Sequence, residues 1–246
     1  MASGFQFHVG TSGFSYDEWR PLFYPEALKA KDMLAFYAAR LPAVELNNTF
    51  YRMPSQKMVA NWRAQVPAGF CFAVKASQRL TWTQKLVDCG ELLGVLRAVL
   101  EPLGPLLGCV FYQVPKWVRK DVAVLRAFLN LPQPSPRVAF EFAHASWHEP
   151  DALAVLREHN AALVASDRDE LPAPELTATA DWAYLRLRRS SYDDAALQSW
   201  AERLQAAGRR AAFVFFKHED SCAGPALAGR FLGLVGQAQV PLPPQG

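Results

Sequence analysis

The sequence predicts a single (β/α)8 barrel, the TIM-barrel class, over its 246 residues. Short β-rich runs alternate eight times with segments that are mostly of helical periodicity, and no change of composition divides the chain. Barrels of this class commonly have about 250 residues. A doubly wound open sheet is the rival, but it needs a G-x-G-x-x-G turn after its first strand, and Gly10 and Gly13 do not have that spacing. The closed barrel is therefore favoured.

The eight strands are predicted from runs rich in β-branched, aromatic and small apolar residues. In chain order they are 7–11, 43–47, 70–75, 108–113, 137–142, 161–166, 182–187 and 211–216. Apolar residues recurring at i, i+3, i+4 and i+7 predict helices. These helices are 34–41, 91–100, 122–129, 151–160, 193–207 and 223–235. The sixth unit is weak, because residues 168–180 contain two prolines and no clear apolar stripe, so its helix is expected to be short or irregular.

Composition limits the class of protein. With 26 Lys and Arg against 23 Asp and Glu, the net charge is only +3, which excludes a basic nucleic-acid-binding arm. The four cysteines lack disulfide or zinc spacing, the amino terminus lacks a secretion signal, and no run of about 20 apolar residues is uninterrupted. We expect one cytoplasmic domain, residues 1–246, with no membrane partner and a disordered tail at 240–246. The sequence does not indicate an oligomeric state.

Polar side chains gather at the carboxyl ends of the predicted strands, where barrel active sites lie. Because side chains alternate along a strand, Glu45 on the second strand is expected to face the barrel axis, as are Lys75 and Glu141 on the third and fifth. The mouth is expected to hold Glu45, Asn47, Lys75, Gln113, Glu141, Asp167, Arg186 and Arg188. Each could also belong to a solvated loop or a structural ion pair, but their convergence favours a site.

The loops after the strands are unusually aromatic. Large rings there either cap the helix layer or form a wall on which a flat ligand ring stacks. The candidates for such a wall are Tyr16, Trp19, Tyr51 and Trp147, with His144 beside them. Because Lys75 and Arg186 are expected beneath the wall, the ligand would be a small anion of aromatic or sugar character.

Blocks along nearly the whole chain also occur in the order of a known family. They are GTSGFSYDEW (10–19), VELNNTFY (44–51), FAVK (72–75), FYQVP (111–115), EF (141–142), Asp167 and YLRL (184–187). Together they resemble the YecE-like family, domain of unknown function 72. The resemblance implies a TIM barrel with these residues at its carboxyl face, and it brings no established reaction. The sequence departs from the family pattern at Trp82, Ala143, Arg188 and Lys217-His218, so chemistry that depends on the usual residues would be altered or lost.

Three functions fit these residues. The first is a hydrolase of an anionic sugar- or nucleotide-like substrate, cleaving a glycosidic or phosphoester bond. In it Glu45 and Glu141 are acid and base, Lys75 and Asp167 assist, and Arg186 or Arg188 holds the anion. Lys75 also has the setting of a Schiff-base nucleophile.

The alternatives differ in what the barrel would bind. A metal-dependent phosphoesterase or nuclease needs several His and carboxylate ligands, and with five His and no H-x-E-x-x-H pattern we expect no metal or other cofactor. A non-catalytic barrel would hold a nucleotide or single-stranded nucleic acid by stacking and fixed positive charge. The net charge of +3 is too small to argue for nucleic acid by itself.

Overall fold

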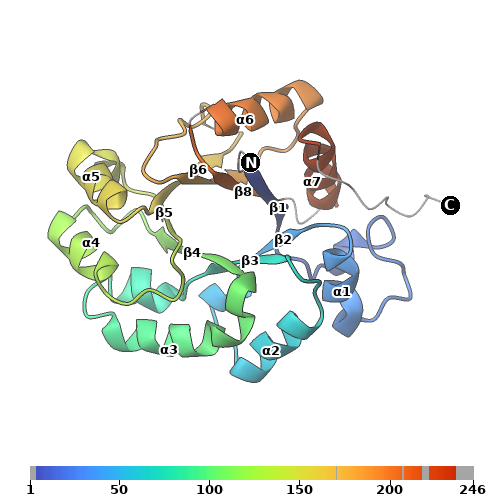
Figure 1. The fold of residues 1–246 in the computed structure, drawn as a ribbon, viewed down its shortest axis with the longest axis horizontal. Coiled ribbons are helices and arrows are strands. Elements are labelled where there is room, and N and C mark those ends of the chain that lie inside the picture. The colour runs from blue at the N-terminus through green and yellow to red at the C-terminus, as the bar shows by residue number, and fades with distance from the viewer. Residues whose placement is uncertain (1–3, 170, 207, 218–221, 237–246) are drawn as a thin grey trace.

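Eight parallel strands close into one barrel in a computed structural model that describes residues 4–169, 171–206, 208–217 and 222–236. Each strand pairs with the next, and β8 pairs with β1 to close the ring at the centre of Figure 1. The strands are β1 (Gln6–Ser12), β2 (Ala43–Leu46), β3 (Cys71–Lys75), β4 (Leu107–Val114), β5 (Val138–Phe142), β6 (Ala162–Asp167), β7 (Trp182–Leu187) and β8 (Ala211–Phe216). The predicted barrel is confirmed, with every strand end within one residue of its expected position. The tail predicted to be disordered, residues 240–246, lies outside the described residues.

Helices surround the barrel on its outer side (Figure 1). They are α1 (Met33–Ala38), α2 (Gln56–Ala64), α3 (Gly90–Leu100), α4 (Val122–Leu129), α5 (Pro150–Glu158), α6 (Asp194–Ala206) and α7 (Ala223–Leu234). The sequence did not predict α2, which buries only Val59 and Trp62 and begins at a cap in which Ser55 accepts from the Met58 amide. In the described chain no helix is long and apolar enough to cross a membrane.

The sixth unit has no helix in the part that the structure describes. Residues 171–181 are held instead by hydrogen bonds in which side chains satisfy backbone groups of this segment and of β6. Thr179 Oγ1 accepts from the Leu163 amide at 2.8 Å, and Arg203 donates to the Pro174 carbonyl at 2.8 Å. Isolated hydrogen bonds between side chains and the backbone thus replace the regular i→i−4 hydrogen bonds of a helix, which the prolines prevent.

The barrel interior combines small and large side chains. Alternate residues of β2, β3 and β5 are Ala or Cys, while β4, β7 and β8 contribute Phe111, Tyr184, Phe213 and Phe215. The large rings of β4, β7 and β8 thus fill the interior space that the small residues of β2, β3 and β5 leave. All four cysteines are buried and unpaired.

Gly10 on β1 is expected to tolerate no side chain. A Cβ there would overlap the backbone carbonyl of Ala43 on the neighbouring strand, which cannot move without breaking the β1–β2 pairing. We expect Gly10→Ala to lower the free energy of unfolding by about 3 kcal/mol or more, as overpacking does. Gly94→Ala on α3 is the matched control, because nothing lies within 4 Å of an added Cβ there, and it should be neutral or stabilising. Urea denaturation measures both, and equal stability of the two variants would refute this account.

Candidate active site

Three charged side chains meet inside the mouth of the barrel. Glu45 of β2 and Glu141 of β5 both bind Arg186 of β7: Nη2 lies 2.9 Å from Glu45 Oε1, and Nη1 lies 3.0 Å from Glu141 Oε2. All three are buried, with Glu45 at 0% exposure. The two carboxylates predicted to act as a pair are therefore brought together, but they share one guanidinium rather than facing each other.

Glu45 has every oxygen committed to a donor. Besides Arg186, Oε1 accepts from Ser12 Oγ at 2.6 Å and from Asn47 Nδ2 at 3.0 Å, and Oε2 accepts from Tyr184 Oη at 2.6 Å. Asn47 Oδ1 is buried and has no partner among the described residues. Glu45 is thus fixed as a structural anion, while Asn47 retains one unused acceptor.

Glu141 continues the network toward Lys75. Gln113 donates through Nε2 to Glu141 Oε2 at 2.6 Å and accepts through Oε1 from Lys75 Nζ at 2.7 Å. The amide orientation of Gln113 is set because a carboxylate can only accept and an ammonium can only donate. Lys75, Gln113, Glu141, Arg186 and Glu45 therefore form one continuous chain of polar contacts across the mouth.

The protonation of these groups follows from their neighbours. Burial raises the pKa of Glu141, but the charges of Arg186, Arg188 and Arg168 outweigh it and lower that pKa to about 2. Burial likewise opposes ionisation of Glu45, yet Arg186 and the three hydrogen bonds hold its pKa below the ordinary value. Both carboxylates are thus ionised at neutral pH.

The surroundings of Lys75, in contrast, favour its neutral form. Burial, then the charge of Arg186, lower the pKa of Lys75 to about 8, against the opposing pull of Glu45 and Glu141. Its Nζ also lies 3.9 Å from the centre of the Phe50 ring. Lys75 is therefore a network member that can exchange a proton near neutral pH.

A cavity of about 460 Å³ opens beside Glu141, bounded by the ends of β4, β5 and β6. Gln113, Ser166, Arg168, His148 and Trp82 are among its walls. Arg168 Nη2 lies 3.2 Å from Glu141 Oε1 with its side chain 40% exposed, so this guanidinium can turn toward a ligand. The volume lies within the range of small-molecule sites.

A row of aromatic rings crosses the loops next to this cavity. Ring centres are 5.0 Å apart for Tyr51 and Phe50, 5.2 Å for Phe50 and Trp82, and 5.1 Å for Trp82 and Trp117. Tyr51 and Trp117 at its two ends are largely exposed. Trp82 and Trp117 were not among the predicted binding residues, although the density of rings after the strands was the signal that pointed to them.

The predicted wall of Tyr16, Trp19 and Trp147 is wrong for its two tryptophans. Trp19 and Trp147 are each 1% exposed, and therefore offer no face to a ligand. Trp19 packs on Tyr16 at 4.8 Å, and Trp147 lies parallel to Phe142 at 4.4 Å. These rings cap the helix layer, which was the alternative. Tyr16 Oη donates to the Ser12 carbonyl at 2.7 Å and does not line the cavity.

Asp167 and His144 also lie outside the network. Along β6 the inward-facing positions are Ala162 and Val164, so the alternation directs Ser166 inward and Asp167 toward the helices. Asp167 binds Arg189 Nε at 2.7 Å and Tyr192 Oη at 3.1 Å. His144 Nδ1 accepts from the Ser146 amide at 3.1 Å as a turn cap. The prediction that Asp167 faces the mouth is wrong because it lies one residue beyond the inward-facing Ser166.

Within the described ranges, no three or more His, Cys, Asp and Glu side chains are grouped so as to hold a metal ion. His218, one of the histidines considered near the mouth, lies outside the described residues.

Comparison with known proteins decides the family. The sequence model described as "Protein of unknown function DUF72" matches residues 8–246. The chain belongs to the DUF72 family. A crystallised DUF72 protein from Thermotoga maritima has a TM-score of 0.79 at 26% identity, covering 94% of this chain and 100% of that one.

Two curated relatives of this DUF72 chain carry UPF0759 names. YunF of Bacillus subtilis is 29% identical over 152 residues, which are 58% of this chain and 52% of YunF. YecE of Escherichia coli K12 is 27% identical over 108 residues, which are 44% of this chain and 37% of YecE. The chain thus spans about half or less of the length of the curated relatives it matches. The YecE-like resemblance seen in the sequence is confirmed.

Proposed function

We propose that the mouth is the active site of a hydrolase that acts on an anionic sugar- or nucleotide-like substrate, with a phosphoester as the bond broken. The observation that carries this proposal is an excess of positive charge. Lys75, Arg168, Arg186 and Arg188 surround only two carboxylates, Glu45 and Glu141. Partly buried cations without matching anions are costly, and a phosphate group supplies the missing charge.

Arg168 and Arg188 are assigned to the substrate anion. Arg188 is half-buried on the same side of β7 as Arg186, close enough to Glu141 to lower its pKa, and no hydrogen bond of its guanidinium is found within the described chain. Arginine forks match phosphate oxygens in pairs. Arg186 is a positioning residue, because its terminal nitrogens are occupied by Glu45 and Glu141. The unused acceptor of Asn47 suits a substrate hydroxyl.

Lys75 is assigned the proton transfer to the leaving group, which the sequence predicted for Glu45 or Glu141. Glu45 and Glu141 are held ionised, so neither can serve as the acid, whereas the pKa of Lys75 is about 8. A water molecule attacks phosphorus while the ester P–O bond breaks and the leaving oxygen takes a proton from the Lys75 ammonium. The proton lost by water then restores Lys75. Glu141 orients that water by accepting its hydrogen bond.

The test is hydrolysis of a panel of sugar phosphates, nucleotides and p-nitrophenyl phosphate, with p-nitrophenyl glycosides as the contrasting bond class. Lys75→Met is expected to lower kcat by about 100-fold or more with KM little changed, because it removes proton transfer and leaves the arginines. Lys57→Met on the exposed face of α2 is the control and should match the wild type. Hydrolysis that persists in Lys75→Met, or turnover of no phosphoester in the panel, contradicts the proposal.

A non-catalytic role has one observation in its favour, the exposed rings at the ends of the aromatic row. Tyr51 and Trp117 offer open faces on which successive bases can stack beside the cationic mouth. Binding of oligothymidylate, followed by tryptophan fluorescence, should then weaken about ten-fold in Trp117→Ala and fall with salt. Saturable binding with no turnover of any panel compound would favour this second function over the hydrolase.

A further inference from the structure

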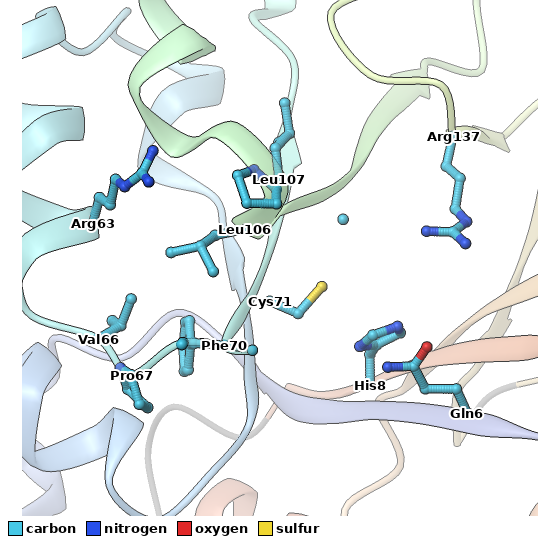
Figure 2. A pocket seen from close by; sticks show the side chains of 14 residues that line it. Gln6, His8, Arg63, Val66, Pro67, Phe70, Cys71, Leu106, Leu107 and Arg137 are labelled. Atoms are coloured by element: carbon cyan, nitrogen blue, oxygen red, sulfur yellow. The ribbon is translucent and has the colours of Figure 1, made fainter.

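A second cavity, of about 530 Å³, opens at the opposite end of the barrel from the mouth. Figure 2 shows it among the amino ends of the strands, with Gln6 and His8 from β1, Cys71 from β3, Arg137 just before β5, and Arg63 from α2. No Asp or Glu is among the residues that line it. The cavity is therefore a separate space whose only formal charges are positive.

One side of this cavity is polar. The guanidinium of Arg137, the ring of His8 and the amide of Gln6 are turned toward the same space in Figure 2. The ring of His8 is held by stacking on Phe213, with the ring centres 4.6 Å apart. Burial, with the charge of Arg137, lowers the pKa of His8 to about 4, so the imidazole is neutral and can donate or accept. Arg137 is exposed and makes no ion pair within the described residues, so its guanidinium is accessible to an anion that enters the cavity.

The other side of the cavity is apolar. Val66, Pro67, Phe70 and Leu106 form this wall in Figure 2. Arg63 stands at its edge and is fixed there by donating from Nη1 to the Pro102 carbonyl at 2.9 Å. A ligand that satisfied both sides would have an anionic group at Arg137 and a compact apolar body against Val66, Pro67 and Leu106, whose side chains are at least partly exposed.

We propose that this cavity binds a small amphipathic anion, a carboxylate or phosphate carried on a single apolar ring or short chain. The volume suits such a molecule, and a charge-assisted bond to an unpaired guanidinium supplies orientation. The amino end of a barrel is the end associated with stability rather than chemistry. The ligand is therefore bound without turnover, and it stabilises the fold by mass action.

The experiment uses the full chain with Arg168→Gln, which weakens anion binding at the mouth, and compares two further substitutions in that background. Arg137→Gln removes the proposed partner. Arg210→Gln is the matched control, because this exposed arginine lies at the same end of the barrel, faces Asp181 and does not line the cavity. The probes are phenyl phosphate, benzoate, inorganic phosphate and benzyl alcohol, and binding is measured by calorimetry and by the shift in Tm.

Phenyl phosphate or benzoate is expected to bind saturably and raise Tm, with the tighter of the two identifying the head group. Arg137→Gln should weaken it about ten-fold, as loss of one charge-assisted bond does, and Arg210→Gln should leave it unchanged. Inorganic phosphate and benzyl alcohol should each bind at least five-fold more weakly, since each lacks one half of the ligand. Affinity that is equal in Arg137→Gln and Arg210→Gln, or no saturable binding at all, overturns the inference. Hydrolysis by the wild type is scored separately, so the two proposals fail independently.

Discussion

Replacement of Arg186 by Gln is expected to lower the free energy of unfolding at pH 7 by about 3–5 kcal/mol, because it leaves two buried carboxylates without their counter-charge. Glu45 and Glu141 both depend on this guanidinium, at 2.9 and 3.0 Å. The control is Arg126→Gln, which breaks an exposed ion pair with Glu158 on the helix layer and should change the free energy of unfolding far less, because solvent screens that pair. Urea denaturation followed by circular dichroism measures both.

The pH dependence separates lost charge pairing from lost packing. The pKa of Glu141 is about 2 in the folded chain and near 4.3 when unfolded, so its contribution is complete above the unfolded value and disappears as pH falls through the folded one. In Arg186→Gln both carboxylates protonate more readily, and the stability deficit should shrink below about pH 5. A deficit that is the same at pH 7 and pH 4 would assign the effect to packing alone.

Lys75 is expected to titrate with a midpoint near pH 8, more than two units below the ordinary lysine value. The cause is burial first and Arg186 second. Between about pH 8 and 10.5 the unfolded chain binds more protons at this residue than the folded chain, so Lys75 makes stability rise with pH over that range. Proton-detected NMR of ¹³C-methylated lysines reports the midpoint directly, and Lys75→Met identifies the signal.

Two variants test the cause of that shift. Glu141→Gln removes a charge that favours the ammonium and should move the Lys75 midpoint further down, whereas Lys217→Gln removes a repelling cation and should move it up. Glu149→Gln, an exposed carboxylate paired with Lys120, is the control and should leave the midpoint in place. A Lys75 midpoint near 10.5, or one that does not respond to Glu141→Gln, would contradict the electrostatic account of the mouth.

The strands and most helices were predictable because their signal is local. A run such as residues 211–216 is apolar along its whole length, and the apolar spacing of 122–129 matches α4. The helix α2 was missed because its buried face consists of Val59 and Trp62 alone, too few for a periodic stripe.

Which side chains of a strand point to the barrel axis was predictable only where the sequence shows unambiguously which alternate positions are inward. Glu45, Lys75 and Glu141 lie where the alternation predicts. The prediction for Asp167 is wrong, because only the small inward-facing residues of β6, such as Ala162, show which alternate positions of this strand point to the barrel axis. Ring type likewise says nothing about burial: Trp147 is packed on Phe142, while Trp117 lies open.

The sharing of one arginine by two carboxylates could not be predicted. Glu45 and Arg186 are 141 positions apart in sequence, and their contact depends on how all eight strands close. The ionised state of both carboxylates depends first on this shared guanidinium, and the acid role proposed for Lys75 rests on that state.

The bridging arginine also has a consequence for the order in which the chain can be assembled. A segment that ends before β7 already contains Glu45 and Glu141 but not the guanidinium that both require. A half made of β1–β4 would contain Glu45 without Arg186. The other half would contain Arg186 with Glu141 but without Glu45. Unlike a barrel whose halves are each complete, this one gives both buried carboxylates their shared guanidinium only when the seventh strand joins the six before it, so a split between β4 and β5 separates ion-pair partners as well as strands.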